Sequence, residues 1–97
     1  MAKGYWIVHV DVTDPDRYPE YQAQVAEAFA AFKYKPKFLV RGGNSENTEG
    51  SVKPRHVLVQ FETYDDALEC YRSDGYQAAV TLRQQFGATD FVIVEGA

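Results

Sequence analysis

The chain has 97 residues, with 14 acidic and 10 basic side chains and a formal net charge of −4. A chain of this size buries only about 60–65% of the surface it exposes when unfolded, so residues 1–97 are expected to form one small domain. The basic residues are scattered, which argues against a nucleic-acid partner. A membrane partner is not expected either, because no apolar run approaches the roughly 20 residues that span a bilayer.

The cysteine content bears on the compartment. Cys70 is the only cysteine and cannot form an internal disulfide. The stretch MAKGYWIVHVDV lacks the basic-then-apolar pattern of a secretory signal, so we expect a reducing, cytoplasmic location. Cys70 adjoins apolar residues, which favours a buried, inert thiol over a nucleophile.

The first half of the chain predicts a strand, a helix and a second strand. Residues 5–12 alternate, with Trp6, Val8, Val10 and Val12 on one face and Tyr5, Ile7, His9 and Asp11 on the other. Asp14 is the expected N-cap of a helix with Pro15 at its first position. Lys33 and Lys35 suit the end of this helix, and Pro36 stops it before a strand at residues 37–41.

The second half repeats the pattern. Residues 55–62 predict a strand with Val57, Val59 and Phe61 on one face and His56, Leu58 and Gln60 on the other. Thr63 begins a helix through a capping-box-like sequence, and Ser73-Asp74-Gly75 breaks that helix. A further amphipathic helix is expected to run to Gly87 as its C′ residue, followed by a buried strand at residues 91–96.

The predicted order is β-α-β-β-α-β, which is typical of an α+β, ferredoxin-like fold with a four-stranded antiparallel sheet in the order 4-1-3-2. Both helical segments would cover one face of this sheet. The other face would carry Ile7, Leu58 and either Phe91 or Ile93, which is too apolar for water. We therefore expect a homodimer in which two sheets pack together.

Several stretches, in this order, resemble one bacterial family. They are GYWIVHVDVTDPDRYPEY, KFLVRGG followed by EG, PRHVLVQF, YRSDGYQAAVTLRQ and DFVIVEG, which together extend from Gly4 to Gly96. The family they resemble is the domain-of-unknown-function family numbered thirteen-thirty. The resemblance implies a dimeric α+β barrel but no activity. Relatives by fold include cofactor-independent monooxygenases, dehydratase-like proteins and haem-degrading proteins, so the fold analogy favours a small-molecule pocket.

The segment FLVRGGNSENTEG, residues 38–50, raises the question of a phosphate-binding loop. Such a loop needs a lysine followed by Ser or Thr and a helix, and neither follows Gly42-Gly43. The two glycines therefore predict a bend or bulge. Arg41 beside them is a candidate to bind a ligand carboxylate, and a salt bridge with Glu46 or Glu49 is the alternative.

His9 is the best general acid or base candidate, with an interface histidine as the alternative. We expect strands one and three to be parallel neighbours, which would place Gln60 nearer to His9 than His56. The candidate metal ligands His9, His56 and Asp11 are too widely spaced along the strands to predict a metal site. No cofactor is expected.

The chain is rich in tyrosine, and one or two of these side chains are expected to face a cavity. Tyr18 and Tyr64 are the candidates, together with Arg41 and Gln60, for contacts with a ligand. Three hypotheses remain open: a homodimer that binds a small, partly apolar metabolite; a cofactor-independent enzyme with His9 as base and Tyr18 or Tyr64 steadying negative charge; and a dimerisation module without a ligand.

Overall fold

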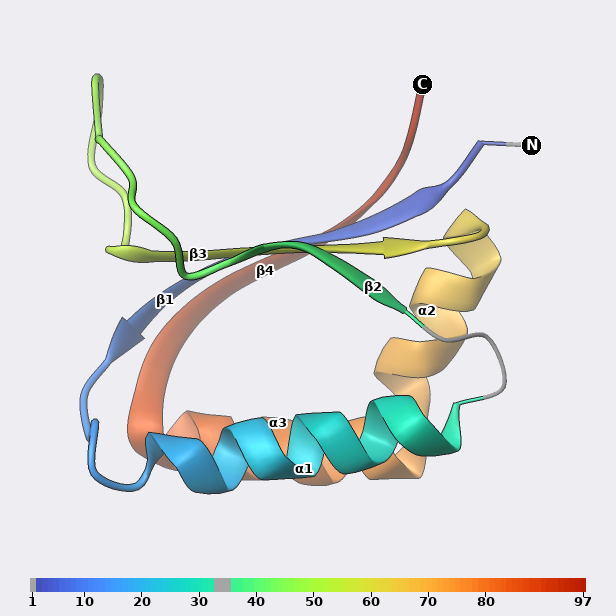
Figure 1. Cartoon of the computed structure of the whole chain (residues 1–97), viewed down its shortest axis with the longest axis horizontal. Coiled ribbons are helices and arrows are strands. Elements are labelled where there is room, and N and C mark those ends of the chain that lie inside the picture. The colour runs from blue at the N-terminus through green and yellow to red at the C-terminus, as the bar shows by residue number, and fades with distance from the viewer. Residues whose placement is uncertain (1, 33–35) are drawn as a thin grey trace.

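A computed structural model describes residues 2–32 and 36–97 of the chain. The elements are β1 (Gly4–Val12), α1 (Tyr18–Ala31), β2 (Lys37–Arg41), β3 (Arg55–Phe61), α2 (Tyr64–Arg72), α3 (Asp74–Phe86) and β4 (Gly87–Glu95). They form two layers, a four-stranded sheet and the pair α1 and α3, with α2 at one end (Figure 1). The predicted ferredoxin-like fold is thereby confirmed. Within the described residues, no helix is both long enough and apolar enough to cross a bilayer.

The strand order is β2-β3-β1-β4, which is the predicted order 4-1-3-2 read from the opposite edge. All three strand pairs are antiparallel, so the prediction that β1 and β3 run parallel was wrong. The crossover through α1 returns β2 in the direction of β1, and the loop at residues 42–54 reverses the chain. Because β3 enters between β1 and β2, it runs antiparallel to both.

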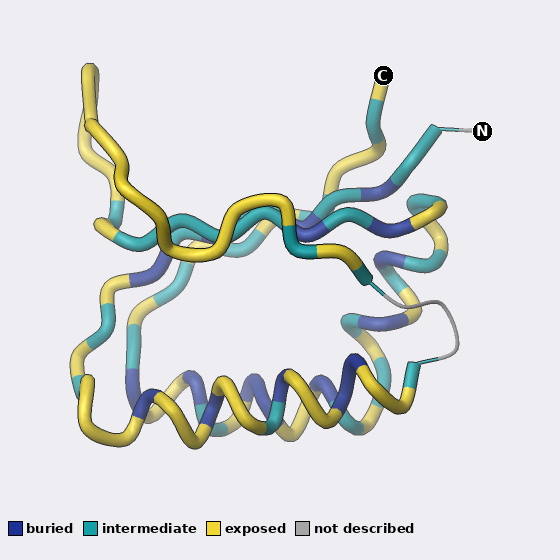
Figure 2. The backbone as a smooth tube through the Cα atoms, in the orientation of Figure 1, coloured by how far each residue is buried: buried dark blue, intermediate teal, exposed yellow. Residues whose placement is uncertain are grey.

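The two faces of the sheet differ in burial, as the alternation of β1 predicts (Figure 2). Trp6, Val8 and Val10 are buried against the helices, and the side chains between them are half-buried on the open face. On β4 the prediction that Phe91 or Ile93 lies on the open face was wrong. Val92 pairs with Ile7 and lies on the open face, so Phe91 and Ile93 turn toward the core instead.

The beginning of α1 was predicted three residues too early. Residues 15–17 form a turn, and α1 begins at Tyr18 with Arg17 as its N-cap. Asp14 accepts hydrogen bonds from this turn, since its carbonyl lies 3.0 Å from the Tyr18 amide and its Oδ1 lies 3.3 Å from the Arg17 amide. The other end has Phe32 as its C-cap, and the predicted roles of Lys33 and Lys35 lie outside the described residues.

The caps of the second half agree better with the prediction. Thr63 Oγ1 accepts from the Asp66 amide at 3.0 Å and so caps α2. Ser73 ends α2 and caps α3, which confirms the predicted break. Gly87, however, is already the first residue of β4 with an extended φ of −170°, so β4 starts four residues earlier than predicted.

The core centres on Trp6, which is 1% exposed. Its ring centroid lies between 4.5 and 5.6 Å from those of Phe29, Phe61, Tyr76 and Phe91. Its Nε1 donates to the Ala67 carbonyl at 3.0 Å, which satisfies the buried polar atom. α1 packs mainly along α3 and makes few contacts with the strands. The aromatic ring of Phe29 on α1 reaches the sheet, where it contacts Trp6 on β1 and Phe38 on β2.

Candidate functional site

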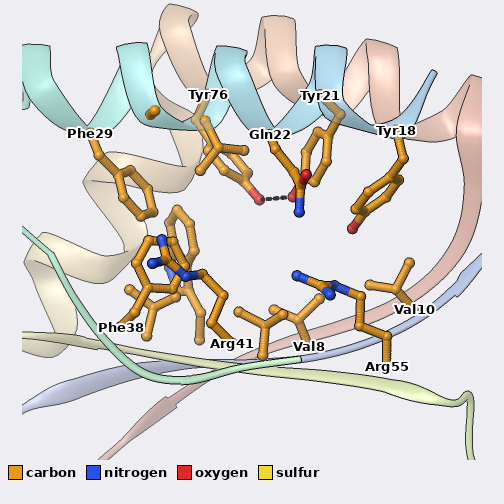
Figure 3. A pocket seen from close by; sticks show the side chains of 15 residues that line it. Val8, Val10, Tyr18, Tyr21, Gln22, Phe29, Phe38, Arg41, Arg55 and Tyr76 are labelled. Carbon is orange, nitrogen blue, oxygen red and sulfur yellow. Dashed lines mark hydrogen bonds between the residues drawn. The ribbon is translucent and has the colours of Figure 1, made fainter. Parts of the chain in front are cut away.

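A cavity of about 420 Å³ lies between α1 and the helix-facing side of the sheet. Most of its lining is aromatic or aliphatic, with a few polar side chains from α1, β2, β3 and α3 (Figure 3). The lining consists of Trp6, Val8, Val10, Tyr18, Tyr21, Gln22, Val25, Ala26, Phe29, Phe38, Arg41, Arg55, Val57, Val59 and Tyr76. This volume and this mixture are typical of small-molecule sites.

Two arginines rise into the cavity from the sheet (Figure 3). Arg41 ends β2 and pairs with Val57, and Arg55 precedes Val57 by two residues on the same face of β3. They are therefore diagonal neighbours, whose backbone positions in a sheet lie about 7–8 Å apart. The Arg41 guanidinium lies 4.6 Å from the Phe38 ring centroid, and that of Arg55 lies 5.7 Å from the Tyr18 ring centroid.

Three tyrosines face the two arginines from the helices. The hydroxyls of Tyr21 and Tyr76 lie 3.3 Å apart, and buried Arg83 donates to the Tyr76 hydroxyl at 3.3 Å. Burial, with a contribution from Tyr21, raises the pKa of Tyr76 far above its ordinary value. Burial also raises the pKa of Tyr18, although Arg55 opposes this shift. Tyr18 and Tyr76 therefore stay protonated at neutral pH.

The cavity brings together only some of the side chains singled out from the sequence. Arg41 and Tyr18 line it. His9 and Gln60 lie on the opposite, open face of the sheet, and half-buried Tyr64 begins α2 outside the cavity lining. The geometry therefore does not place His9 and Arg41 around one ligand.

The sequence interpretation named the wrong neighbour for His9. The antiparallel register places His56 opposite His9, with 2.8 Å between their Nδ1 atoms, whereas Gln60 pairs with Tyr5. This corrects the expectation that Gln60 is the nearer neighbour. In residues 2–32 and 36–97 no three His, Cys, Asp or Glu side chains are grouped closely enough to hold a metal ion.

The segment after β2 is a bend and not a phosphate loop. Gly42 has a φ of +69°, its amide donates to the His56 carbonyl at 2.9 Å, and no helix follows before β3. The irregularity in the β2–β3 register lies earlier, between Phe38 and Val40. Arg41 has no ion pair with Glu46 or Glu49 in the described part of the chain.

Cys70 is fully buried in α2. Burial, with a smaller contribution from Glu69, raises the pKa of its thiol to about 12. A thiol in this state is a poor nucleophile, which agrees with the predicted structural role.

Sequence reasoning missed Arg55 as a cavity residue. The signal was present, because Arg55 precedes Val57, Val59 and Phe61 at the two-residue spacing of one strand face. A charged residue that continues an inward-facing row is either paired or directed at a ligand. Gln22 carried no comparable signal, since it is an exposed residue of α1 beside buried Tyr21.

The fold is shared with several solved structures. A protein of unknown function from Rhodopseudomonas palustris matches with a TM-score of 0.71 at 14% identity, covering 99% of this chain and 83% of the other. A dimeric ferredoxin-like protein of unknown function from Thermobifida fusca matches with a TM-score of 0.64 at 18% identity, covering 99% and 91%. SnoaB, a cofactor-independent oxygenase from Streptomyces nogalater, matches with a TM-score of 0.65 at 11% identity, covering 100% and 95%. At these identities the similarity establishes the fold alone.

No curated protein matches the sequence significantly. The family model described as "Domain of unknown function (DUF1330)" matches residues 3–97, which is nearly the whole chain. The match confirms the resemblance seen in the sequence, and the chain belongs to this family.

Proposed function

We propose that the protein is a homodimer that binds a small, partly apolar metabolite in the cavity between α1 and the sheet. The cavity of about 420 Å³ carries this proposal, because its apolar walls surround a few converging polar groups. Tyr18 and Arg41 are the ligand contacts retained from the sequence candidates. The proposal does not include Tyr64 and Gln60, which lie outside the cavity lining.

The open face of the sheet supports the dimer. Val92, Val94 and Val40 are 50%, 38% and 41% exposed, and Ile7 and Leu58 lie between these strands. The solvated face of an antiparallel sheet is usually polar, whereas this face carries these five aliphatic side chains beside its polar ones. A second copy of the same sheet would cover it, and the Thermobifida fusca neighbour is described as dimeric.

Catalysis is the second candidate. The Streptomyces neighbour is a cofactor-independent oxygenase, and His9 was the expected base. His9 is separated from the cavity by the sheet, so it would act only on a substrate bound at the open face. A cavity reaction would instead use Tyr18 or the Tyr21–Tyr76 pair, whose hydroxyls point into the cavity.

Native mass spectrometry of freshly purified protein tests the proposal. We expect a species of about twice the 11.0-kDa chain mass, with additional mass from a retained small molecule. Val92→Asp should yield a monomer, because a carboxylate would be buried between the sheets. Val52→Asp is the matched control, since Val52 is 41% exposed in the loop outside the sheet.

Four outcomes distinguish the hypotheses. A monomer at micromolar concentration would refute the dimer. A dimer that neither retains a ligand nor binds one from a metabolite mixture would favour a dimerisation module. Turnover that survives His9→Ala would exclude His9 as the base, whereas loss of turnover with retained binding would favour the enzyme hypothesis.

A further inference from the structure

We infer that the cavity recognises a monocarboxylate with an apolar body, and that Arg41 and Arg55 together bind its carboxylate. This inference rests on the proposed ligand-binding function of the same cavity. It adds the substrate class and assigns a site role to Arg55. Three features of the cavity support it, namely its charge, its hydrogen-bond donors and the geometry that holds Arg55.

The first feature is the positive charge of the cavity. The protein as a whole is acidic, with a net charge of −4. The charged side chains of the lining are nevertheless both cationic, Arg41 and Arg55, and no described lining residue is acidic. Buried Arg83 stands behind Tyr76 and adds a third positive charge. In a partly water-excluded space these charges favour an anion.

The second feature is the excess of hydrogen-bond donors over acceptors in the lining. An arginine has five N–H donors and no acceptor. The Tyr21 and Tyr76 hydroxyls contribute two protons but share only one hydrogen bond, and Arg83 already donates to Tyr76, so one hydroxyl proton remains for a ligand. Tyr18 offers another protonated hydroxyl. A ligand that fits this cavity must mainly accept hydrogen bonds, as a carboxylate does.

The third feature is the position of Arg55, which the protein holds in place without an ion-pair partner in the described residues. Its Nε is buried and has no hydrogen-bond partner there. Gly42 packs directly against its guanidinium, and a side chain at position 42 would overlap it. An unpaired buried N–H of a charged group is costly, and a bound carboxylate would repay that cost through a bidentate contact.

The apolar part of the ligand follows from the remaining walls. Val8, Val10 and Val59 form the floor, and Phe29 and Phe38 close one end. These side chains offer only dispersion contacts and suit an aromatic ring or a short acyl chain. A planar carboxylate fits the forked guanidinium groups of the two arginines, of which Arg41 lies over Phe38 and Arg55 lies over Tyr18.

The test is an NMR titration of the ¹⁵N-labelled full chain with four small probes. They are 3-phenylpropionate, the neutral 3-phenylpropionamide, the cationic 3-phenylpropylamine and phenyl phosphate. We expect the carboxylate to bind roughly 10- to 100-fold more tightly than the amide, which corresponds to a charge-assisted hydrogen-bond contribution. The amine should bind more weakly than both.

Variants connect this preference to the two arginines. Arg55→Gln and Arg41→Gln should each reduce carboxylate affinity toward that of the amide, and they should reduce carboxylate affinity much more than amide affinity. Arg55→Lys keeps the charge but removes the fork, and it should retain only part of the preference. If Arg55→Gln does not fold, exposed Arg41→Gln and Arg55→Lys still decide the question. Lys37→Gln is a matched control on β2, because Lys37 is exposed and outside the cavity lining.

The possible results separate the two proposals. Equal affinity for acid and amide would overturn the carboxylate site while leaving a small-molecule cavity. Tighter binding of phenyl phosphate than of 3-phenylpropionate would overturn the carboxylate class. If no probe perturbs the amides around the cavity at millimolar concentration, both the carboxylate site and the proposed binding function of this cavity fail.

Discussion

His9 and His56 face each other across β1 and β3 on the open face of the sheet, with 2.8 Å between their Nδ1 atoms. Such a hydrogen bond requires one imidazole to donate from Nδ1 and the other to accept there, so at least one ring must be uncharged. The charged groups around the pair are Asp90, which is opposite His9 on β4, its ion-pair partner Lys53 and Asp11 on β1. Asp90 is already paired with Lys53 at 2.6 Å.

Removing one partner should therefore weaken this contact. His56→Leu leaves the His9 Nδ1 without this hydrogen-bond partner, and we expect it to lower the unfolding free energy by about 0.5–1.5 kcal/mol. Gln60→Leu makes a similar change on the same face of β3, where Gln60 pairs with Tyr5, and should cost less. Urea unfolding of the three proteins measures the difference, and equal losses in the two variants would contradict it.

The same pair shows why the sequence predicts some features and not others. The alternation of β1 assigned its faces correctly, because a strand with one buried face must repeat every two residues. Nothing in that alternation states the direction of the neighbouring strand. A parallel pairing and an antiparallel pairing bury the same side chains, yet only the antiparallel one brings His56 to His9.

The sequence predicted that a cavity exists, but it predicted only some of the residues that line it. Tyr18 and Arg41 were identified from residue type and neighbouring glycines, and both line the cavity. Arg55 could have been found, because it continues the inward-facing row of Val57, Val59 and Phe61 on β3. Gln22 required knowledge that α1 is held away from the sheet, which depends on tertiary packing that a single sequence does not encode locally.

Thr63 caps α2 through its hydroxyl, which accepts from the Asp66 amide at 3.0 Å. Thr63→Ala should lower the unfolding free energy by about 1 kcal/mol, since a helix amide loses its partner. Thr63→Ser keeps the oxygen and should lose less than half as much. Urea denaturation of the three proteins compares them, and equal losses in the two variants would indicate that the methyl group matters and the cap does not.

Cys70 should resist thiol reagents while the protein is folded. Its pKa of about 12 leaves a very small thiolate fraction, on the order of 10⁻⁴ at pH 8. We expect a disulfide reagent such as 5,5′-dithiobis(2-nitrobenzoate) to react about a thousandfold more slowly than with the urea-unfolded chain. The Cys70→Ala variant has no thiol and measures the background rate of the reagent. Rapid labelling of the folded protein would contradict the buried, inert thiol.

Gly42 and Gly43 form a matched pair for testing how the cavity is built. Gly42 has a φ of +69° and lies against the Arg55 guanidinium, whereas a side chain at Gly43 would meet nothing within 4 Å. Gly42→Ala should cost about 1–2 kcal/mol from the left-handed backbone conformation alone. It should also displace Arg55, because the new methyl group would occupy the space of the guanidinium. Gly43→Ala should leave stability within about 0.5 kcal/mol of the wild type.

Two measurements separate these effects. Urea unfolding reports the backbone cost, and titration with 3-phenylpropionate reports whether Arg55 still reaches the cavity. A Gly42→Ala protein that is destabilised but binds the carboxylate normally would show that Arg55 moves freely and that the glycine serves only the turn. Loss of both stability and carboxylate preference, with Gly43→Ala unaffected, would show that the bend after β2 positions the arginine because only glycine fits between the chain and the guanidinium.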